Sequence, residues 1–105
     1  MTDKIVVLVT CSSAEEASRI AHALVERRLA ACVNIVDGVQ SVYRWKGAVE
    51  EAAERLLLVK TARSHFEALQ SAIRELHSYD VPEIVALPIV EGLEAYLGWI
   101  GTSIS

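Results

Sequence analysis

The sequence predicts an α+β fold of the ferredoxin-like type, a βαββαβ arrangement in which two βαβ units are interleaved. Strand-like apolar runs alternate with two helical segments in the order β-α-β-β-α-β. Two long strand-like segments also meet at a two-residue Lys-Gly turn, which is typical of a hairpin. A short helix should follow the last strand. The length of 105 residues fits a single domain over 1–105.

The first half of the chain gives the clearer elements. Residues 4–11, KIVVLVTC, form a β-branched apolar run that is typical of a central strand. Ser13, with Glu16 three residues later, predicts a capping box and a helix over 14–29. Val, Ile, Tyr and Trp then predict a strand over 32–45. We expect a bulge or turn in it at Asp37-Gly38.

The segment 48–62 is ambiguous, because its first half favours a helix by propensity and its second half favours a buried strand. The preceding Lys46-Gly47 turn favours a hairpin, so we interpret 48–62 as a strand and not as a helix.

Ser64 and Glu67 predict a second capping box and a helix that ends near His77. A strand over 83–90 follows. Pro88 places this strand at a sheet edge, because proline has no N–H to donate to a neighbouring strand. The final helix is expected over 93–104.

The length of the hairpin predicts a homo-oligomer. Each arm has up to 15 residues, or about 50 Å of extended chain, whereas a 100-residue domain has a radius of gyration of about 13 Å. Such a hairpin overshoots its own domain, so other chains are needed to cover its apolar residues and edges.

Composition narrows the possible partners and compartment. The chain is 52% hydrophobic and carries a net charge of −4 without a basic cluster, which argues against nucleic acid and anionic membranes. No apolar run approaches the roughly 18 residues of a membrane span, and the N-terminal run is too short for a signal peptide. We therefore expect a cytoplasmic protein with reduced cysteines.

Several motifs resemble the CutA divalent-cation tolerance family. They are the hairpin ACVNIVDGVQSVYRWKGAVEEAAERLLLVKT, the stretch LHSYDVPEIVALPI with its His-x-Tyr-x-x-Pro-Glu pattern, and YLGWI near the C-terminus. The resemblance covers nearly the whole chain. It implies a PII-like ferredoxin fold, a homotrimer assembled through the hairpins, and binding of copper or another divalent metal. It implies no enzymatic reaction.

His77 is the one position that matches the copper ligands proposed for bacterial members of the family. His77 stands at the second of their two adjacent histidine positions, whereas Leu76 occupies the first and Val9 occupies the position of their first-strand cysteine. Cys11 lies two residues further along the strand, on the same face, and could substitute. Thiolate and imidazole suit Cu(I) or Zn. Further ligands would come from Glu83, Asp80 or another subunit. The alternative role for His77 is a helix C-terminal residue.

Five more residues are candidates for a ligand pocket or a subunit interface. Lys60 ends an apolar run and could pair with the carboxylate of Glu83 near a cleft. Tyr79 and Trp45 could form an aromatic wall. Cys32 is either a reactive thiol or a small buried hydrophobe, and the same alternatives apply to Cys11.

Three other functions compete with metal binding. A PII-like small-ligand sensor would need a partner loop where this chain has only Lys46-Gly47, and a Gly-rich phosphate loop is absent. An acylphosphatase-like enzyme would need an Arg after the first strand, where the sequence reads TCSSAEE. A structural or scaffold trimer without essential metal stays open.

Overall fold

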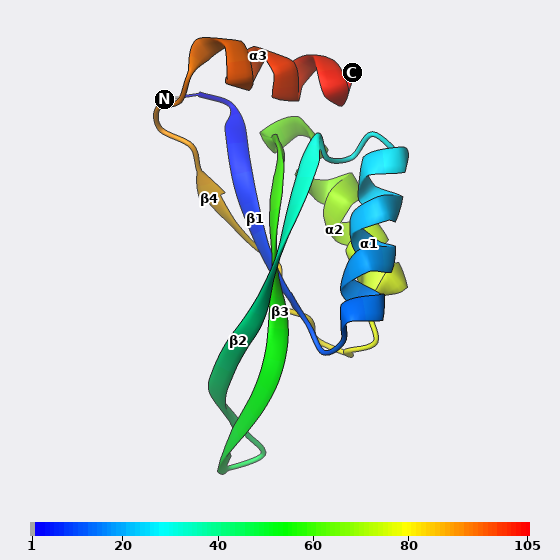
Figure 1. The fold of residues 1–105 in the computed structure, drawn as a ribbon, viewed down its shortest axis with the longest axis vertical. Coiled ribbons are helices and arrows are strands. Elements are labelled where there is room, and N and C mark those ends of the chain that lie inside the picture. The colour runs from blue at the N-terminus through cyan, green and yellow to red at the C-terminus, as the bar shows by residue number, and fades with distance from the viewer. Residues whose placement is uncertain (1) are drawn as a thin grey trace.

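The structure, a computed structural model, describes residues 2–105. Four strands and three α-helices follow in the predicted order, and a 3₁₀ turn comes before the second helix (Figure 1). The elements are β1 (Lys4–Cys11), α1 (Ala14–Glu26), β2 (Cys32–Trp45), β3 (Ala48–Ala62), η1 (Arg63–His65), α2 (Phe66–Leu76), β4 (Val85–Pro88) and α3 (Glu94–Ser103).

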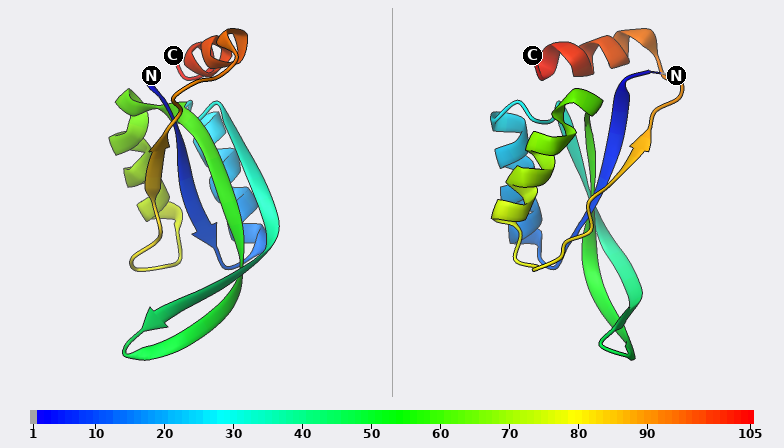
Figure 2. Two further views of the ribbon diagram at one scale, coloured as in Figure 1. Left: turned by 90° about the vertical axis from the view of Figure 1, so that its left-hand side faces the viewer. Right: turned by 180° about the vertical axis from the view of Figure 1, so that it is seen from behind.

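The sheet is antiparallel throughout, with strand order β2-β3-β1-β4. This is the split βαβ topology that the sequence predicted, and β4 is an edge strand as Pro88 indicated. Helices α1 and α2 cover one face of the sheet, while α3 crosses the end of the sheet near the N-terminus (Figures 1 and 2). In the described residues no helix has the length and apolar character needed to cross a membrane.

Strand β1 positions the core because its residues alternate in burial. Ile5, Val7, Val9 and Cys11 point toward α1 and α2 and are buried, and the residues between them are only half-buried. The opposite face of the sheet carries no helix (Figure 2). Register places Thr10, Asn34 and Lys60 on it together with a larger apolar set: Val6, Leu8, Val36, Leu56, Leu58, Val85 and Leu87.

The β2–β3 hairpin is the longest feature of the molecule and extends beyond the helices (Figure 1). The molecule measures 44 × 25 × 23 Å. The register of the hairpin shifts between Val36 and Val39, so the expected bulge at Asp37-Gly38 is confirmed. Lys46 and Gly47 have φ of 49° and 82°, which is the left-handed conformation of a tight type I′ hairpin turn. The strand interpretation of 48–62 is therefore confirmed.

Two boundaries differ from the sequence prediction for local reasons. Helix α1 ends at Glu26 and not at 29, because Arg28 adopts a left-handed φ of 59°. Strand β4 covers only Val85–Pro88 of the expected 83–90, since its pairing with β1 begins at Val85.

The second capping box is also wrong. Ser64 lies inside the 3₁₀ turn η1, so helix α2 begins at Phe66 with His65 as its N-cap and without a side-chain cap. The Ser64 hydroxyl lies 3.0 Å from His65 Nδ1 instead of capping the helix.

Gly38 and Gly98 should respond oppositely to the same substitution. Gly38 has φ of +73°, so Gly38→Ala should destabilise the fold by about 1 kcal/mol although nothing lies within 4 Å of the new Cβ. Gly98 is an exposed position inside α3 with equal space, so Gly98→Ala should stabilise by up to about 1 kcal/mol. Denaturant unfolding of both variants at one protein concentration measures this. Equal effects of the same sign would contradict the backbone assignment.

Candidate functional site

Three buried side chains from three different elements meet beside the end of β1. They are Cys11 on β1, Glu16 in the first turn of α1, and His77 directly after α2. One ligand atom from each (Sγ, a carboxylate oxygen and a ring nitrogen) lies within 4.8 Å of the other two. We refer to Cys11, Glu16 and His77 as the buried cluster.

His77 is held by hydrogen bonds at both ring nitrogens. Its Nε2 lies 2.7 Å from the carbonyl oxygen of Thr10, and the backbone N–H of Tyr79 donates to its Nδ1 over 3.0 Å. A carbonyl can only accept, so the hydrogen-bond network assigns the ring proton to Nε2 and makes Nδ1 an acceptor. Nδ1 is also 4.0 Å from Glu16 Oε1. The ring therefore joins β1 to the loop after α2.

Glu16 does only half of what the capping box predicted. Its backbone N–H donates to the Ser13 hydroxyl oxygen over 3.1 Å, but its carboxylate accepts from the N–H of Ser78 over 2.7 Å. Burial is the largest influence and would raise the pKa of Glu16, but the hydrogen bonds from Ser78, together with smaller contributions from His77 and the Ser12 backbone, hold the pKa below its ordinary value. The carboxylate is therefore ionised at neutral pH.

The second carboxylate oxygen of Glu16, Oε1, is buried without a hydrogen bond in the described residues. Glu16 is 5% exposed, and its Oε1 has no hydrogen-bond partner in the described part of the chain. Leaving a buried ionised oxygen unpaired is costly, so such an atom marks a place for a cation or proton donor.

Sequence reasoning missed Glu16 as a site residue, although a signal was available. Glu16 lies at four-residue spacing with Ile20 and Leu24, on the apolar stripe of α1, where an acidic residue is unexpected.

Cys11 supplies a thiol that stays protonated. Burial, together with the nearby carboxylates of Glu16 and Glu54, raises the pKa of Cys11 to about 12. Cys11 lies near His77, as a substitute for the first-strand cysteine ligand would have to. Val9 is fully buried in the apolar core and Leu76 packs against it, so neither position offers a ligand.

The donor set of the buried cluster fits a metal ion. Thiolate, imidazole and carboxylate are the ligand types of zinc, and sulfur with nitrogen also suits copper. Ligands at about 2.0–2.3 Å from zinc lie about 3.3–3.8 Å apart, so the cluster would have to contract slightly. Loading would also require Cys11 to lose its proton and His77 Nδ1 to give up the Tyr79 N–H.

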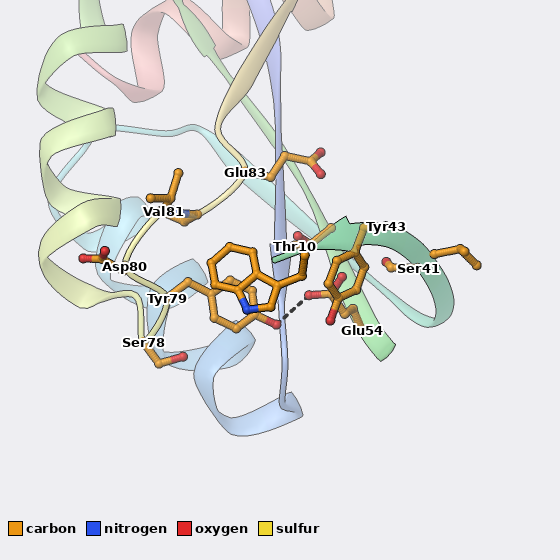
Figure 3. A pocket seen from close by; sticks show the side chains of 12 residues that line it. Thr10, Ser41, Tyr43, Glu54, Ser78, Tyr79, Asp80, Val81 and Glu83 are labelled. Carbon is orange, nitrogen blue, oxygen red and sulfur yellow. Dashed lines mark hydrogen bonds between the residues drawn. The ribbon is translucent and has the colours of Figure 1, made fainter. Parts of the chain in front are cut away.

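A second feature, an open cleft of about 880 Å³, lies between the hairpin and the loop 78–83. Tyr79 reaches from the loop to the hairpin, where its hydroxyl donates to Glu54 over 2.7 Å (Figure 3). Burial and the neighbouring Glu54 raise the pKa of Tyr79, so the phenol stays a donor. Trp45 and Glu83 line the same cleft. The structure thus brings together three of the predicted pocket residues.

Lys60 and Cys32 lie elsewhere, and the expected Lys60–Glu83 pair is wrong. Lys60 donates to Asn34, and no ion pair joins it to Glu83 among residues 2–105. Cys32 is the cross-strand partner of Lys60, and its thiol lies 3.9 Å from Asn34 Oδ1. Glu83 and Asp80 line the cleft and do not join the buried cluster, whose third member is Glu16.

Comparison with known proteins decides the family. Residues 5–103 match the family model described as CutA1 divalent ion tolerance protein. The chain belongs to this family. Members of the CutA1 family are named for tolerance to divalent cations, and the descriptions of the family and of the relatives reported below name no reaction.

Individual relatives agree with this assignment. The chain is 59% identical over 95 residues to the divalent-cation tolerance protein CutA of Thermus thermophilus, covering 90% of this chain and 92% of that protein. It is 46% identical to the chloroplastic CutA of Arabidopsis thaliana over 94% of this chain, but spans only 54% of that protein. The crystal structure of CutA from Xylella fastidiosa superposes with a TM-score of 0.97 at 39% identity, covering 99% of this chain and 100% of that one.

Cys11 should be unreactive in the native protein. In a Cys32→Ser background, iodoacetamide at about pH 8 should modify Cys11 at least about 100-fold more slowly in the native protein than in concentrated urea, because burial keeps the thiol protonated and inaccessible. Intact mass against time measures the rate. Equal rates in the two conditions would show that Cys11 is not buried as described.

Proposed function

We propose that this protein binds a divalent or soft metal ion at the buried cluster, and that this binding is its part in divalent-cation tolerance. The observation that carries the proposal is the buried Oε1 of Glu16, which has no hydrogen-bond partner in residues 2–105 and lies 4.0 Å from His77 Nδ1. The family name, tolerance to divalent cations, supports the same function.

The donor chemistry narrows the metal to copper or zinc. A thiolate and an imidazole favour Cu(I) and Zn(II) over the hard cations Mg²⁺ and Ca²⁺, and the carboxylate adds to the preference for Zn(II). The thiol of Cys11 must also remain reduced, which fits a cytoplasmic location.

Metal loading would have two consequences for this chain. Cys11 would release its proton, so affinity should rise with pH below about pH 12. His77 Nδ1 would exchange the Tyr79 N–H for the metal, so the loop 78–83 would lose one of the bonds that hold it.

We also propose that the chain assembles as a homotrimer through the hairpin and the helix-free face of the sheet. Large apolar residues on the hairpin are exposed, with Trp45 at 55% and Val49 at 65%. The helix-free face adds Val85 and Leu87, which are about half exposed. An apolar surface of this kind is expected to be covered by another chain.

Metal binding should depend on the buried cluster. Competition titrations with Zn(II), and with Cu(I) under reducing conditions, should show binding by the wild type. Cys11→Ser and Glu16→Gln keep the size of each side chain but remove a ligand charge, so they should weaken binding by about 100-fold. His77→Ala should do the same.

Two controls make this result specific. Cys32→Ser removes the other thiol and His22→Ala removes an exposed imidazole, and neither should change the affinity. Affinity should also rise by up to about tenfold per pH unit, because one proton leaves Cys11. Wild-type affinity in both Cys11→Ser and Glu16→Gln would refute the buried cluster as the site.

Assembly can be tested with a matched pair of substitutions. Val36 lies on the helix-free face and Val25 on the outer surface of α1, and they are 41% and 42% exposed. Light scattering should give a mass near three times the 11.5 kDa chain for the wild type and for Val25→Lys. The mass of the Val36→Lys variant should fall toward that of the monomer, because assembly would bury the lysine charge without a partner, which costs several kcal/mol. A monomeric wild type would contradict the proposal.

A further inference from the structure

The helix-free face of the sheet carries a lysine among apolar side chains. Register places Lys60 between Cys32 on β2 and Val6 on β1. The Lys60 ammonium donates to the side-chain oxygen of Asn34, which is a neutral amide. When another chain covers this face, the ammonium loses its contact with water, and a buried charge is stable only beside an opposite charge. Lys60 therefore needs an anion from the covering chain.

The other end of the same face carries an acidic group. Glu54 lies on β3 six residues before Lys60. Side chains alternate along a strand, so Glu54 points to the same side of the sheet as Leu56 and Lys60. Six residues of strand span about 20 Å, which is too far for the two charges to pair within one chain. The helix-free face thus has a positive end and a negative end.

The cleft between the hairpin and the loop 78–83 lies at the negative end and has no cation of its own. None of its twelve lining residues is Lys or Arg, and three are acidic, Glu54, Asp80 and Glu83. No salt bridge joins these three to a cation among residues 2–105. Glu54 is 7% exposed and accepts one hydrogen bond, from the Tyr79 hydroxyl at 2.7 Å (Figure 3). A carboxylate has about four acceptor positions, so Glu54 has capacity for an ammonium donor.

The hairpin wall of this cleft belongs to the surface that we propose another chain covers. Val42, Tyr43 and Trp45 line the cleft and are exposed in the single chain. The occupant of the cleft is then a part of that other chain. A purely apolar occupant would bury Glu54 without pairing it, which is costly. A lysine fits the lining better, because its apolar stem packs against the aromatic rings while its ammonium reaches the carboxylate.

The symmetry of a trimer agrees with a contact between opposite ends of the face. A closed ring of three identical chains has heterologous interfaces, in which one surface of each chain meets a different surface of the next. Lys60 and Glu54 give the helix-free face two such ends with complementary charge. Contact between like ends would instead bring ammonium groups together without an anion, and like charges repel.

We propose that Lys60 of one chain enters the cleft of the next chain in the ring and pairs there with Glu54, so that each cleft is completed by two chains. This inference rests on the proposed homotrimer and adds the residues that orient its chains. It does not depend on metal binding at the buried cluster.

Cross-linking of isotope-mixed trimers tests the contact directly. Equal amounts of unlabelled and ¹⁵N-labelled protein are refolded together and treated with a carbodiimide, which joins an amine to a carboxylate in contact. A product within one chain has two isotopic masses, whereas a product between chains has four. We expect a four-mass product that joins Lys60 to Glu54. A product that joins Lys60 to a carboxylate outside the cleft of another chain would overturn the proposal.

A double-mutant cycle measures the same pairing through subunit exchange. Lys60→Met and Glu54→Gln keep the approximate size of each side chain and remove its charge. Each alone leaves one buried charge unpaired, so the exchange rate between labelled and unlabelled trimers, followed by native mass spectrometry, should rise at least about tenfold. The double variant should exchange no faster than the faster single variant, because both charges are gone.

Matched controls carry the same charge changes on the outer helix layer. Arg74→Met and Glu67→Gln alter exposed residues of α2, and both should exchange at the wild-type rate. Glu54→Gln keeps an acceptor for the Tyr79 hydroxyl, and an unchanged far-UV circular dichroism spectrum checks that each variant is folded.

The results separate this inference from the proposed homotrimer. A wild type that is monomeric at micromolar concentration would contradict the homotrimer and this inference with it. A trimeric wild type in which the effects of Lys60→Met and Glu54→Gln simply add in the double variant would contradict only the pairing of Lys60 with Glu54.

Discussion

The imidazole of His77 is the contact on which the candidate site depends. The ring receives the Tyr79 N–H and lies 2.7 Å from the Thr10 carbonyl, so it joins the start of the loop 78–83 to the end of β1. Both ring nitrogens are used, and the side chain is fully buried. Any change at this ring leaves at least one buried backbone group without its partner, which costs about 1–3 kcal/mol.

The same loop belongs to both features of the site. Ser78 donates its N–H to Glu16 in the buried cluster, and the hydroxyl of Tyr79 donates to Glu54 in the cleft. The buried cluster and the cleft are therefore neighbours across one short segment. A ligand that takes His77 Nδ1 would act on the Tyr79 backbone, and through it on one wall of the cleft, without a large movement of the strands or helices.

The sequence predicted the fold well, because strand and helix periodicities, the Lys46-Gly47 turn and the edge position of Pro88 are local signals. The capping motif at Ser64 failed because the chain forms a 3₁₀ turn there. The site was harder to predict. His77 was a candidate ligand and Cys11 a possible substitute for a missing one, but Glu16 was interpreted as a capping residue. Its contact with Ser78 joins residues 62 positions apart, which no local pattern encodes. The predicted Lys60–Glu83 pair does not form. Lys60 lies opposite Cys32 on the neighbouring strand, and its ammonium group donates to the side-chain oxygen of Asn34.

The most direct test of this account is the tautomer and metal ligation of the His77 ring, measured by long-range ¹H–¹⁵N correlation spectra with and without Zn(II). The account predicts that metal-free His77 carries its proton on Nε2, with Nδ1 as an acceptor and the Tyr79 amide protected from exchange. Saturating Zn(II) should shift the Nδ1 resonance and remove the protection of the Tyr79 amide. A proton on Nδ1 in the metal-free protein, or an Nδ1 resonance that Zn(II) leaves unchanged, would contradict it.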